Sequence, residues 1–185
     1  TGMKAEKFVE YIRSIGIELY AGIPDSTLKG LCSYLNEDKA IRHYTLADEG
    51  AAIALAIGEY LASGRVGCVY MQNSGMGNMV NPMTSLAHSE VYGIPILLVI
   101  GWRGEPGRKD EPQHKFMGRI TETLLTDLEI EYSILDDNTT KRDFEAILNA
   151  ARERMADNKQ YALLVKKGFF ETNELAYPTN QHSMS

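Results

Sequence analysis

The run of residues 94–100 constrains the fold of this chain more than any other stretch. It reads Ile-Pro-Ile-Leu-Leu-Val-Ile and contains no polar position. A strand without alternation of polar and apolar residues is typical of a parallel sheet covered by helices on both faces. The run is also far too short to cross a membrane. We therefore expect a fully buried central strand and no membrane span.

Patterns typical of strands and helices alternate along the rest of the chain. Such alternation predicts right-handed βαβ units. We expect an α/β fold, namely a three-layer, doubly wound parallel sheet of about six strands with helices on both faces. Residues 3–168 are expected to form this domain, and residues 169–185 a polar linker or cut end. The predicted strands are 17–23, 41–46, 66–71, 94–100, 132–135 and 161–166, and the predicted helices are about 8–15, 26–36, 49–62, 78–88, 118–128 and 140–156.

Composition and charge narrow the classes of partner and indicate the compartment. The formal net charge is −6, and no basic face offsets it, which argues against nucleic-acid binding. No charged-then-apolar signal segment opens the chain, so a cytoplasmic protein is expected. Cys32 and Cys68 are far apart in apolar surroundings. We expect buried thiols there, rather than a disulfide or a metal pair.

A glycine-containing segment, Asn73-Ser74-Gly75-Met76-Gly77-Asn78, follows the predicted strand 66–71. Glycines allow a positive φ, and they let a flat ligand approach because they carry no Cβ. The helix predicted next would direct its free N–H groups into the same space. A small-molecule site is therefore expected at the carboxyl end of this strand. The pattern leaves the ligand open: a dinucleotide fingerprint needs glycine where Val80 stands, and no P-loop lysine follows.

Two carboxylates lie where other predicted strands end. For Asp25, within Pro24-Asp25-Ser26, capping of the next helix is by itself the better explanation. Glu49 opens an alanine-rich helix, where the helix dipole favours a charged carboxylate. Burial among small apolar residues favours the neutral form instead. Because these effects oppose each other, Glu49 is a candidate for sharing a proton with a bound ring nitrogen.

A connection without predicted secondary structure runs from residue 101 to residue 115. Loops of this length in a compact domain usually serve as lids or binding loops. Its basic residues outnumber its acidic ones, against the sign of the whole chain. An anionic substrate would explain this composition, and a solvated charged loop would explain it equally well.

Three segments taken together resemble the pyrimidine-binding domain of thiamine-diphosphate enzymes. They are Ala47-Asp48-Glu49-Gly50 before the alanine-rich helix, the segment 73–78, and the strand 94–100. The resemblance covers residues 6–168. Within this family, the segments most similar to the phosphonopyruvate decarboxylases are 22–26, 70–78, 101–107 and 109–114.

The resemblance implies a function and a cofactor. The chain would take part in converting 3-phosphonopyruvate to phosphonoacetaldehyde and CO2, as a thiamine-diphosphate-dependent carboxy-lyase. The cofactor acts as the electron sink for the loss of CO2. In this family a glutamate matching Glu49 hydrogen-bonds a ring nitrogen of the aminopyrimidine. The segment with Ser74, Gly75, Gly77 and Asn78 would lie against the same ring.

The resemblance also assigns residues to the substrate, an anionic 2-oxo acid. Asp25 and His114 are expected to deliver a proton after decarboxylation, although a hydrogen bond that anchors the loop explains His114 equally well. Arg103, Arg108 and Lys115 are the candidates for holding the phosphonate. Arginine is best suited to bidentate contacts with its oxygens.

One part of the family pattern is absent from the sequence. The family binds the cofactor diphosphate through Mg²⁺ with a Gly-Asp-Gly motif, which does not occur here. We therefore expect the Mg²⁺ ligands on a partner, a diphosphate-binding domain or subunit, and none on this chain. The chain alone would be inactive, and it is either a fragment or the smaller subunit of a two-chain enzyme. Copies of the chain are also expected to associate, as a homo-oligomer.

Two alternatives remain open. The first is an alpha-type subunit of sulfopyruvate decarboxylase, or of a related 2-oxo acid decarboxylase. Phosphonopyruvate and sulfopyruvate are both three-carbon 2-oxo acids with an anion at the far end, so charge alone does not separate them. The second alternative is a catalytically silent binding or assembly module.

Overall fold

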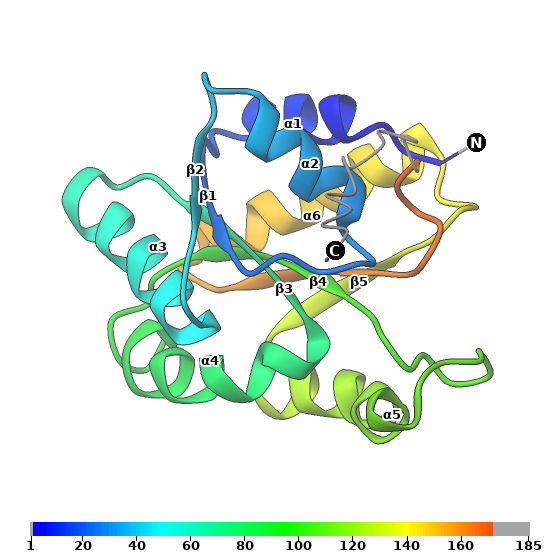
Figure 1. Cartoon of the computed structure of the whole chain (residues 1–185). Helices are drawn as coiled ribbons and strands as arrows, with labels where there is room; N and C mark the ends of the chain where they lie inside the picture. Colours follow the sequence, from blue (N-terminus) through cyan, green and yellow to red (C-terminus); the bar gives the residue numbers. More distant parts are fainter. Residues whose placement is uncertain (1, 172–185) are drawn as a thin grey trace, which may run out of the picture.

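The computed structural model describes residues 2–171, which form a six-stranded parallel sheet (Figure 1). The strands are β1 (Leu19–Gly22), β2 (Arg42–Thr45), β3 (Gly67–Gln72), β4 (Ile96–Gly101), β5 (Glu131–Leu135) and β6 (Tyr161–Val165). They lie in the order β2-β1-β3-β4-β6-β5, and each neighbouring pair is parallel. The predicted fold class is confirmed, and the run 94–100 supplies an interior strand.

Helices cover both faces of the sheet. They are α1 (Ala5–Ser14), α2 (Lys29–Glu37), α3 (Glu49–Ser63), α4 (Met76–Pro82), α5 (Pro112–Asp127) and α6 (Lys141–Ala156). One face carries α1, α2 and α6, and the other carries α3, α4 and α5 (Figure 1). Leu97 and Val99 of β4 point into the first core, and Ile96 and Leu98 into the second. Because both faces are buried, β4 needs no polar positions.

Two glycines follow helices close to the predicted helix ends at residues 15 and 62. Gly16 follows α1 with φ +89°, and Gly64 caps α3 in the left-handed conformation with φ +71°. Glycine tolerates this conformation because it has no Cβ. The helix α6 begins with a capping box in which Thr140 and Asp143 exchange hydrogen bonds.

The glycine-containing segment differs from the prediction. Asn73–Gly75 forms a turn of 3-10 helix that runs directly into α4, and Met83–Ala87 then forms a π-helical turn. Gly75 has φ −75°, and neither Gly75 nor Gly77 has a positive φ. The chain therefore passes from strand to helix without a left-handed turn, and the positive φ that glycine allows is not used here. Space for a neighbouring group is therefore the remaining reason for a glycine in this segment.

The loop after β4 is shorter than predicted. The helix α5 begins at Pro112, so His114 and Lys115 lie in its first turn rather than in a loop. Proline is favoured at the first position of a helix, where its missing N–H would have no partner within the helix. The connection that remains free of helix spans residues 102–111.

The end of the described chain contributes to the core. Phe169 and Phe170 are buried and pack with Phe8 of α1, although the sequence pattern placed the domain boundary just before them. Met3 donates its backbone N–H to Phe169 and accepts one from Glu171. The rest of the expected polar linker, residues 172–185, lies outside the described residues.

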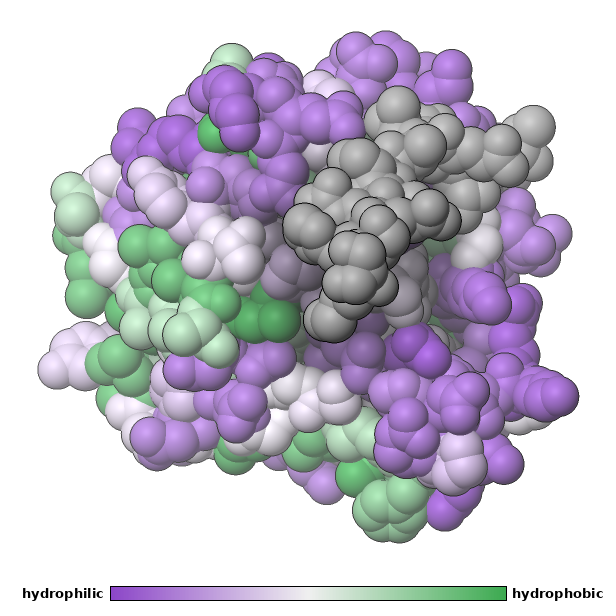
Figure 2. Space-filling model, viewed as in Figure 1, coloured by the Kyte–Doolittle hydropathy of each residue, from purple (hydrophilic) through white to green (hydrophobic). Residues whose placement is uncertain are grey.

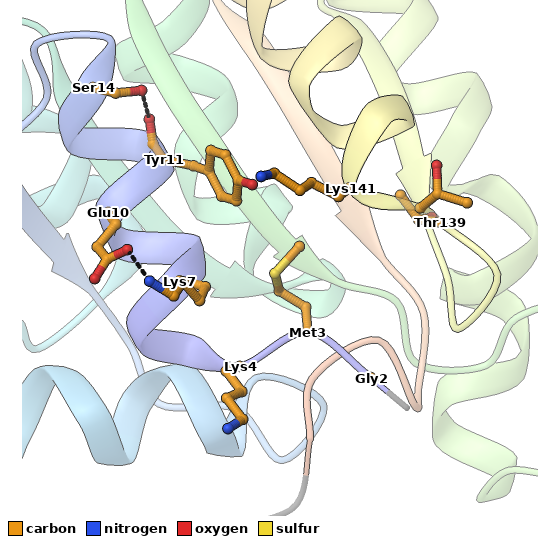
Figure 3. A pocket seen from close by; sticks show the side chains of 10 residues that line it. Gly2, Met3, Lys4, Lys7, Glu10, Tyr11, Ser14, Thr139 and Lys141 are labelled. Carbon is orange, nitrogen blue, oxygen red and sulfur yellow. Dashed lines mark hydrogen bonds and ion pairs between the residues drawn. The ribbon is translucent and has the colours of Figure 1, made fainter.

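The surface is mostly polar in the view of Figure 2, with apolar side chains gathered on the side where α3 lies. Among the described residues, no helix is long and apolar enough to span a membrane. A pocket of about 720 Å³ lies between the N-terminal segment with α1 and the segment before α6 (Figure 3). Lys7 and Glu10 form an ion pair among its lining residues. The pocket contains none of the predicted site residues.

Candidate active site

The loops after four strands bring the predicted residues to one edge of the sheet. Asp25 follows β1, Glu49 follows β2, Gly75 follows β3 and Arg103 follows β4. Because the strands are parallel, their carboxyl ends lie along the same edge, where open α/β sheets bind ligands. Residues that are 78 positions apart in sequence thus belong to one site.

Glu49 is held at the first position of α3. Asp48 caps that helix by accepting a hydrogen bond from the N–H of Ala51 at 2.9 Å. The Glu49 side chain is buried, and its Oε2 accepts a hydrogen bond from Nδ2 of Asn78 at 2.7 Å. Among the described residues no donor reaches Oε1. The carboxylate is therefore fixed through one oxygen and keeps the other for a partner.

Gly75 makes room for this carboxylate. A Cβ on Gly75 would collide with Oε1 of Glu49, whereas a Cβ on Gly77 would meet open space. The two glycines therefore differ in their use. Gly75 is required for the position of Glu49. Gly77 has no side chain, so the backbone beside Asn78 is exposed there. A planar donor group can approach there, so the residues present fit an aminopyrimidine.

The polar residues between these glycines and β3 divide into two kinds. Ser74 is exposed and accepts a hydrogen bond from Gln72 at 2.6 Å. Asn73 is buried, and its side chain bonds the backbone of Arg103 in both directions and the hydroxyl of Thr121. Asn73 therefore ties the end of β3 to the loop after β4 and to α5.

Asp25 is a buried carboxyl group with an unused oxygen. Its side chain is 6% exposed, and Oδ2 accepts hydrogen bonds from the N–H groups of Thr27 and Leu28. Its Oδ1 is buried and has no hydrogen-bond partner among the described residues. Burial raises the pKa of Asp25, although the two N–H groups and the charge of Arg103 act against this. The group therefore keeps a proton to a higher pH than an exposed aspartate.

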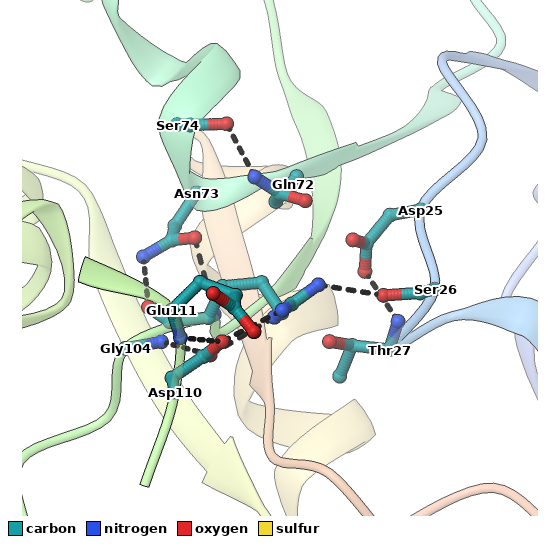
Figure 4. Close-up of polar contacts among 10 residues, drawn as sticks. Asp25, Ser26, Thr27, Gln72, Asn73, Ser74, Gly104, Asp110 and Glu111 are labelled. Carbon is teal, nitrogen blue, oxygen red and sulfur yellow. Dashed lines mark hydrogen bonds and ion pairs between the residues drawn. The ribbon is translucent and has the colours of Figure 1, made fainter. Parts of the chain in front are cut away.

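Arg103 lies opposite Asp25 and is bound by Asp110. Nε and Nη2 of the guanidinium donate to the two oxygens of Asp110, at 2.9 and 2.7 Å, and Nη1 donates to Ser26 at 2.8 Å. Asp110 also accepts from the N–H of Gly104. Arg103 holds the pKa of Asp110 far below its usual range. Figure 4 shows the residues 25–27 facing Asp110 across this cluster.

The remaining predicted cations fall into different settings. Arg108 is exposed and lies 3.3 Å from Glu105, which also binds Lys166 at 2.6 Å. Lys115 is exposed on α5. His114 is half-buried in the first turn of α5, and no hydrogen bond of its side chain to another described residue is found.

A pocket of about 220 Å³ lies beside Arg103. Three of its lining residues, Asp110, Lys109 and Lys167, were not predicted as site residues from the sequence. Lys167 follows β6, so the rule that ligands bind after strand ends was the signal for it. The pocket is lined by Ser26, Thr27, Trp102, Arg103, Glu105, Arg108, Lys109, Asp110 and Lys167.

No group of three or more His, Cys, Asp or Glu residues suited to a metal occurs in the described part of the chain. The two cysteines are both buried and free, as predicted. The arrangement thus offers the Glu49 carboxylate, the buried Asp25 carboxyl group with its raised pKa, and a cationic pocket along one edge of the sheet.

Comparison with protein families gives a match over residues 4–125 to the model described as thiamine pyrophosphate enzyme, N-terminal TPP binding domain. A phosphonopyruvate decarboxylase of Streptomyces viridochromogenes is 40% identical over 165 residues, which are 89% of this chain and 40% of that protein. The chain thus spans about two fifths of that relative's length. A sulfopyruvate decarboxylase subunit alpha of Methanococcus maripaludis is 38% identical over 128 residues, which are 69% of this chain and 74% of that subunit.

A solved structure shares the fold. It was assigned as a thiamin diphosphate-dependent enzyme isolated from Mycobacterium smegmatis, and it matches with a TM-score of 0.67 and 14% sequence identity. The match covers 95% of this chain and 33% of that one.

Proposed function

Since this chain belongs to the family of N-terminal TPP-binding domains of thiamine pyrophosphate enzymes, we propose that it is the pyrimidine-binding half of a decarboxylase that converts 3-phosphonopyruvate to phosphonoacetaldehyde and CO2. The observation that carries the proposal is the buried Glu49 carboxylate, with one oxygen fixed by Asn78 and the other kept clear by Gly75. The 40% identity to a phosphonopyruvate decarboxylase over most of the chain supports the choice of substrate.

In this proposal the residues of the chain bind the cofactor and orient it. When bound, the cofactor supplies the electron sink for the loss of CO2. Through its free Oε1, Glu49 would share a hydrogen bond with a ring nitrogen of the bound cofactor, and Ser74, Gly75, Gly77 and Asn78 would border the ring.

Asp25 and His114 are the candidates for protonating the product. Asp25 suits this role because its raised pKa keeps it able to donate at a pH where an exposed aspartate has lost its proton. His114, in the first turn of α5, is the second candidate. Of the candidate cations, Arg103 and Arg108 line the pocket beside Asp25, and Lys115 is not among its lining residues.

The rest of the active site belongs to a partner. We propose a diphosphate-binding domain or subunit that carries the Mg²⁺ ligands, and a cytoplasmic homo-oligomer as the assembly. The outer side of α3 supports such an interface, because Leu61 is 66% exposed there and Tyr44, on the adjoining β2, is 49% exposed. Apolar side chains gathered on one face are typical of an interaction surface.

A sulfopyruvate decarboxylase subunit is the second candidate. The observation that favours it is the match to a separate alpha subunit, three quarters of which this chain covers. Turnover of the two substrates by the complete enzyme separates the candidates. We expect a higher kcat/KM for 3-phosphonopyruvate, and a higher value for sulfopyruvate would reverse the assignment.

The substitution Glu49→Gln tests the mechanism. We expect the complete enzyme to lose at least about 10²–10⁴-fold in kcat, the usual contribution of an acid–base group. Glu59→Gln is the matched control, because Glu59 lies at the other end of α3 and pairs with Arg42 and Arg65. It should lower stability and leave kcat unchanged. Normal decarboxylation by the Glu49→Gln enzyme would show that the proposed role of Glu49 is wrong.

A further inference from the structure

The pocket beside Arg103 is positively charged in a negatively charged chain. Its lining contains four cations, Arg103, Arg108, Lys109 and Lys167, and two carboxylates, Glu105 and Asp110. The lining therefore carries a net charge of +2, against −6 for the whole chain. A local reversal of this kind raises the concentration of anions at the pocket.

Arg103 is oriented and keeps donors for a ligand. A guanidinium has five N–H donors in a fixed plane. Asp110 takes one from Nε and one from Nη2, and Ser26 takes one from Nη1. Two N–H groups, one on each terminal nitrogen, therefore remain. The bidentate pair with Asp110 holds the plane of the guanidinium in place before any ligand binds.

Lys109 and Lys167 supply charge that the described residues do not neutralise. Neither lysine has an ion pair among residues 2–171, although both line the pocket. Glu105 is occupied by Lys166 and Arg108, and Asp110 by Arg103. Two positive charges thus remain for a ligand.

The pocket is joined to the Glu49 end of the site through Asn73. The Asn73 side chain binds the backbone of Arg103, and Asn73 opens the 3-10 turn that ends at Gly75, against Glu49. The buried Asp25 follows β1, which lies between β2 and β3 in the sheet, and Gly101 of β4 packs against its carboxylate. A short substrate with an anion at one end therefore has its anion site and its reacting end on the same edge.

We propose that this pocket binds the terminal phosphonate of the substrate as a dianion, with Lys109 and Lys167 as the selecting charges and Asp110 as the residue that positions Arg103. This inference rests on the proposed function. A fully ionised phosphonate carries two negative charges, which two lysines without other ion-pair partners would balance. A sulfonate carries a single negative charge and leaves one lysine uncompensated. The pocket thus distinguishes the two candidate substrates by charge.

Steady-state kinetics of the complete enzyme tests this assignment. Lys109→Met and Lys167→Met should each raise KM for 3-phosphonopyruvate by about 10- to 100-fold, as expected for loss of a hydrogen bond to a charged group. Both should leave KM for pyruvate, which has no distal anion, unchanged. Lys141→Met is the matched control, because Lys141 is exposed on α6 and outside the pocket, and it should change neither KM.

Asp110→Asn tests the positioning role. It should raise KM for 3-phosphonopyruvate with little change in KM for pyruvate, and Asp110→Glu should restore part of the loss. An equal loss on both substrates would show a merely structural role for Asp110. An unchanged KM for 3-phosphonopyruvate in both lysine variants would overturn the anion site.

Binding of methylphosphonate to the complete enzyme, followed by titration calorimetry, separates this inference from the proposed function. If the unmodified enzyme does not turn over 3-phosphonopyruvate, the proposed function fails. Methylphosphonate binding that is lost in both lysine variants would then still establish the pocket. Binding that is equal in all variants would overturn it.

Discussion

A buried carboxyl group such as Asp25 destabilises a fold unless every oxygen has a partner. Only Oδ2 of Asp25 has partners among the described residues, while Oδ1 is buried and has none. Leaving a buried polar atom unsatisfied costs about 1–3 kcal/mol. Such residues persist at sites where their chemistry is used, so the structure of Asp25 agrees with a catalytic role.

Asp25→Asn should therefore stabilise the domain while it impairs catalysis. Burial raises the pKa of Asp25 in the folded protein. The protonated Asp25 side chain therefore contributes fully to stability below its ordinary pKa of 3.8. This contribution is lost as the pH rises through the raised pKa of the folded protein. Asparagine carries no titrating group, so the variant should gain about 1.4 kcal/mol at neutral pH for each pH unit by which the pKa is raised. Thermal unfolding of both proteins across a pH series measures the difference.

Asp110→Asn is a control for which the expected change in stability has the opposite sign. The pKa of Asp110 is lowered by Arg103, so its contribution is present above the ordinary value and lost as the pH falls toward the folded value. This variant should be less stable at neutral pH, by about 1–3 kcal/mol. A Tm difference between Asp25→Asn and the unmodified protein that does not change with pH would contradict the raised pKa.

Sequence reasoning found the residues at strand ends but not their partners. Glu49 and Asp25 could be predicted because each follows a strand in a fold that collects such residues at one edge. The bond between Asn73 and Thr121 joins residues 48 positions apart, and Arg103 binds Ser26 over 77 positions. No local pattern encodes such pairs, so the partners of Asn73 and Arg103 could be identified only in the structure.

At the scale of elements, the backbone conformation where β3 runs into α4 determines why Gly75 and Gly77 are glycines. A glycine in a motif is needed either for a positive φ or for space, and the sequence does not say which. In this junction the backbone is helical, so only space is left as a reason. At Gly75 a Cβ would collide with Glu49, so glycine is needed there for space. At Gly77 a Cβ would collide with nothing in this chain.

Gly75→Ala and Gly77→Ala should therefore have opposite effects on stability. The Cβ that Gly75→Ala introduces would displace the Glu49 carboxylate and lower the Tm. The Cβ that Gly77→Ala introduces meets open space within α4, where alanine stabilises a helix by about 0.5–1 kcal/mol relative to glycine. If Gly77 borders the cofactor ring, Gly77→Ala should also weaken binding of thiamine diphosphate to the complete enzyme. Equal Tm changes in the two variants would contradict this account.

At the scale of the whole molecule, the alternation of strands and helices was sufficient to predict the sheet. The order of its strands was not predicted, because β1 lies between β2 and β3, and β4 lies beside β6. Those neighbours depend on pairing between distant segments. The burial of Phe169 and Phe170 was missed for the same reason, since their partner, Phe8, lies at the other end of the domain.

The chain by itself should bind thiamine diphosphate weakly. It offers the ring a carboxylate and a bare backbone, but no Gly-Asp-Gly motif for the diphosphate. Titration calorimetry with Mg²⁺ should show tight binding only after the completing domain or subunit is supplied. The complete enzyme is the positive control. Tight, Mg²⁺-dependent binding to this chain alone would contradict the division of the site between two halves.

The contact between Met3 and residues 169–171 closes the domain on itself. Met3 forms backbone hydrogen bonds with Phe169 and Glu171, which follow the last strand. These bonds join the segment before α1 to the segment after β6. The two ends of the described domain thus support each other, and the sheet needs no further segment to hold them together. We therefore expect the domain to keep its fold whether a completing domain is fused to it or supplied as a separate chain.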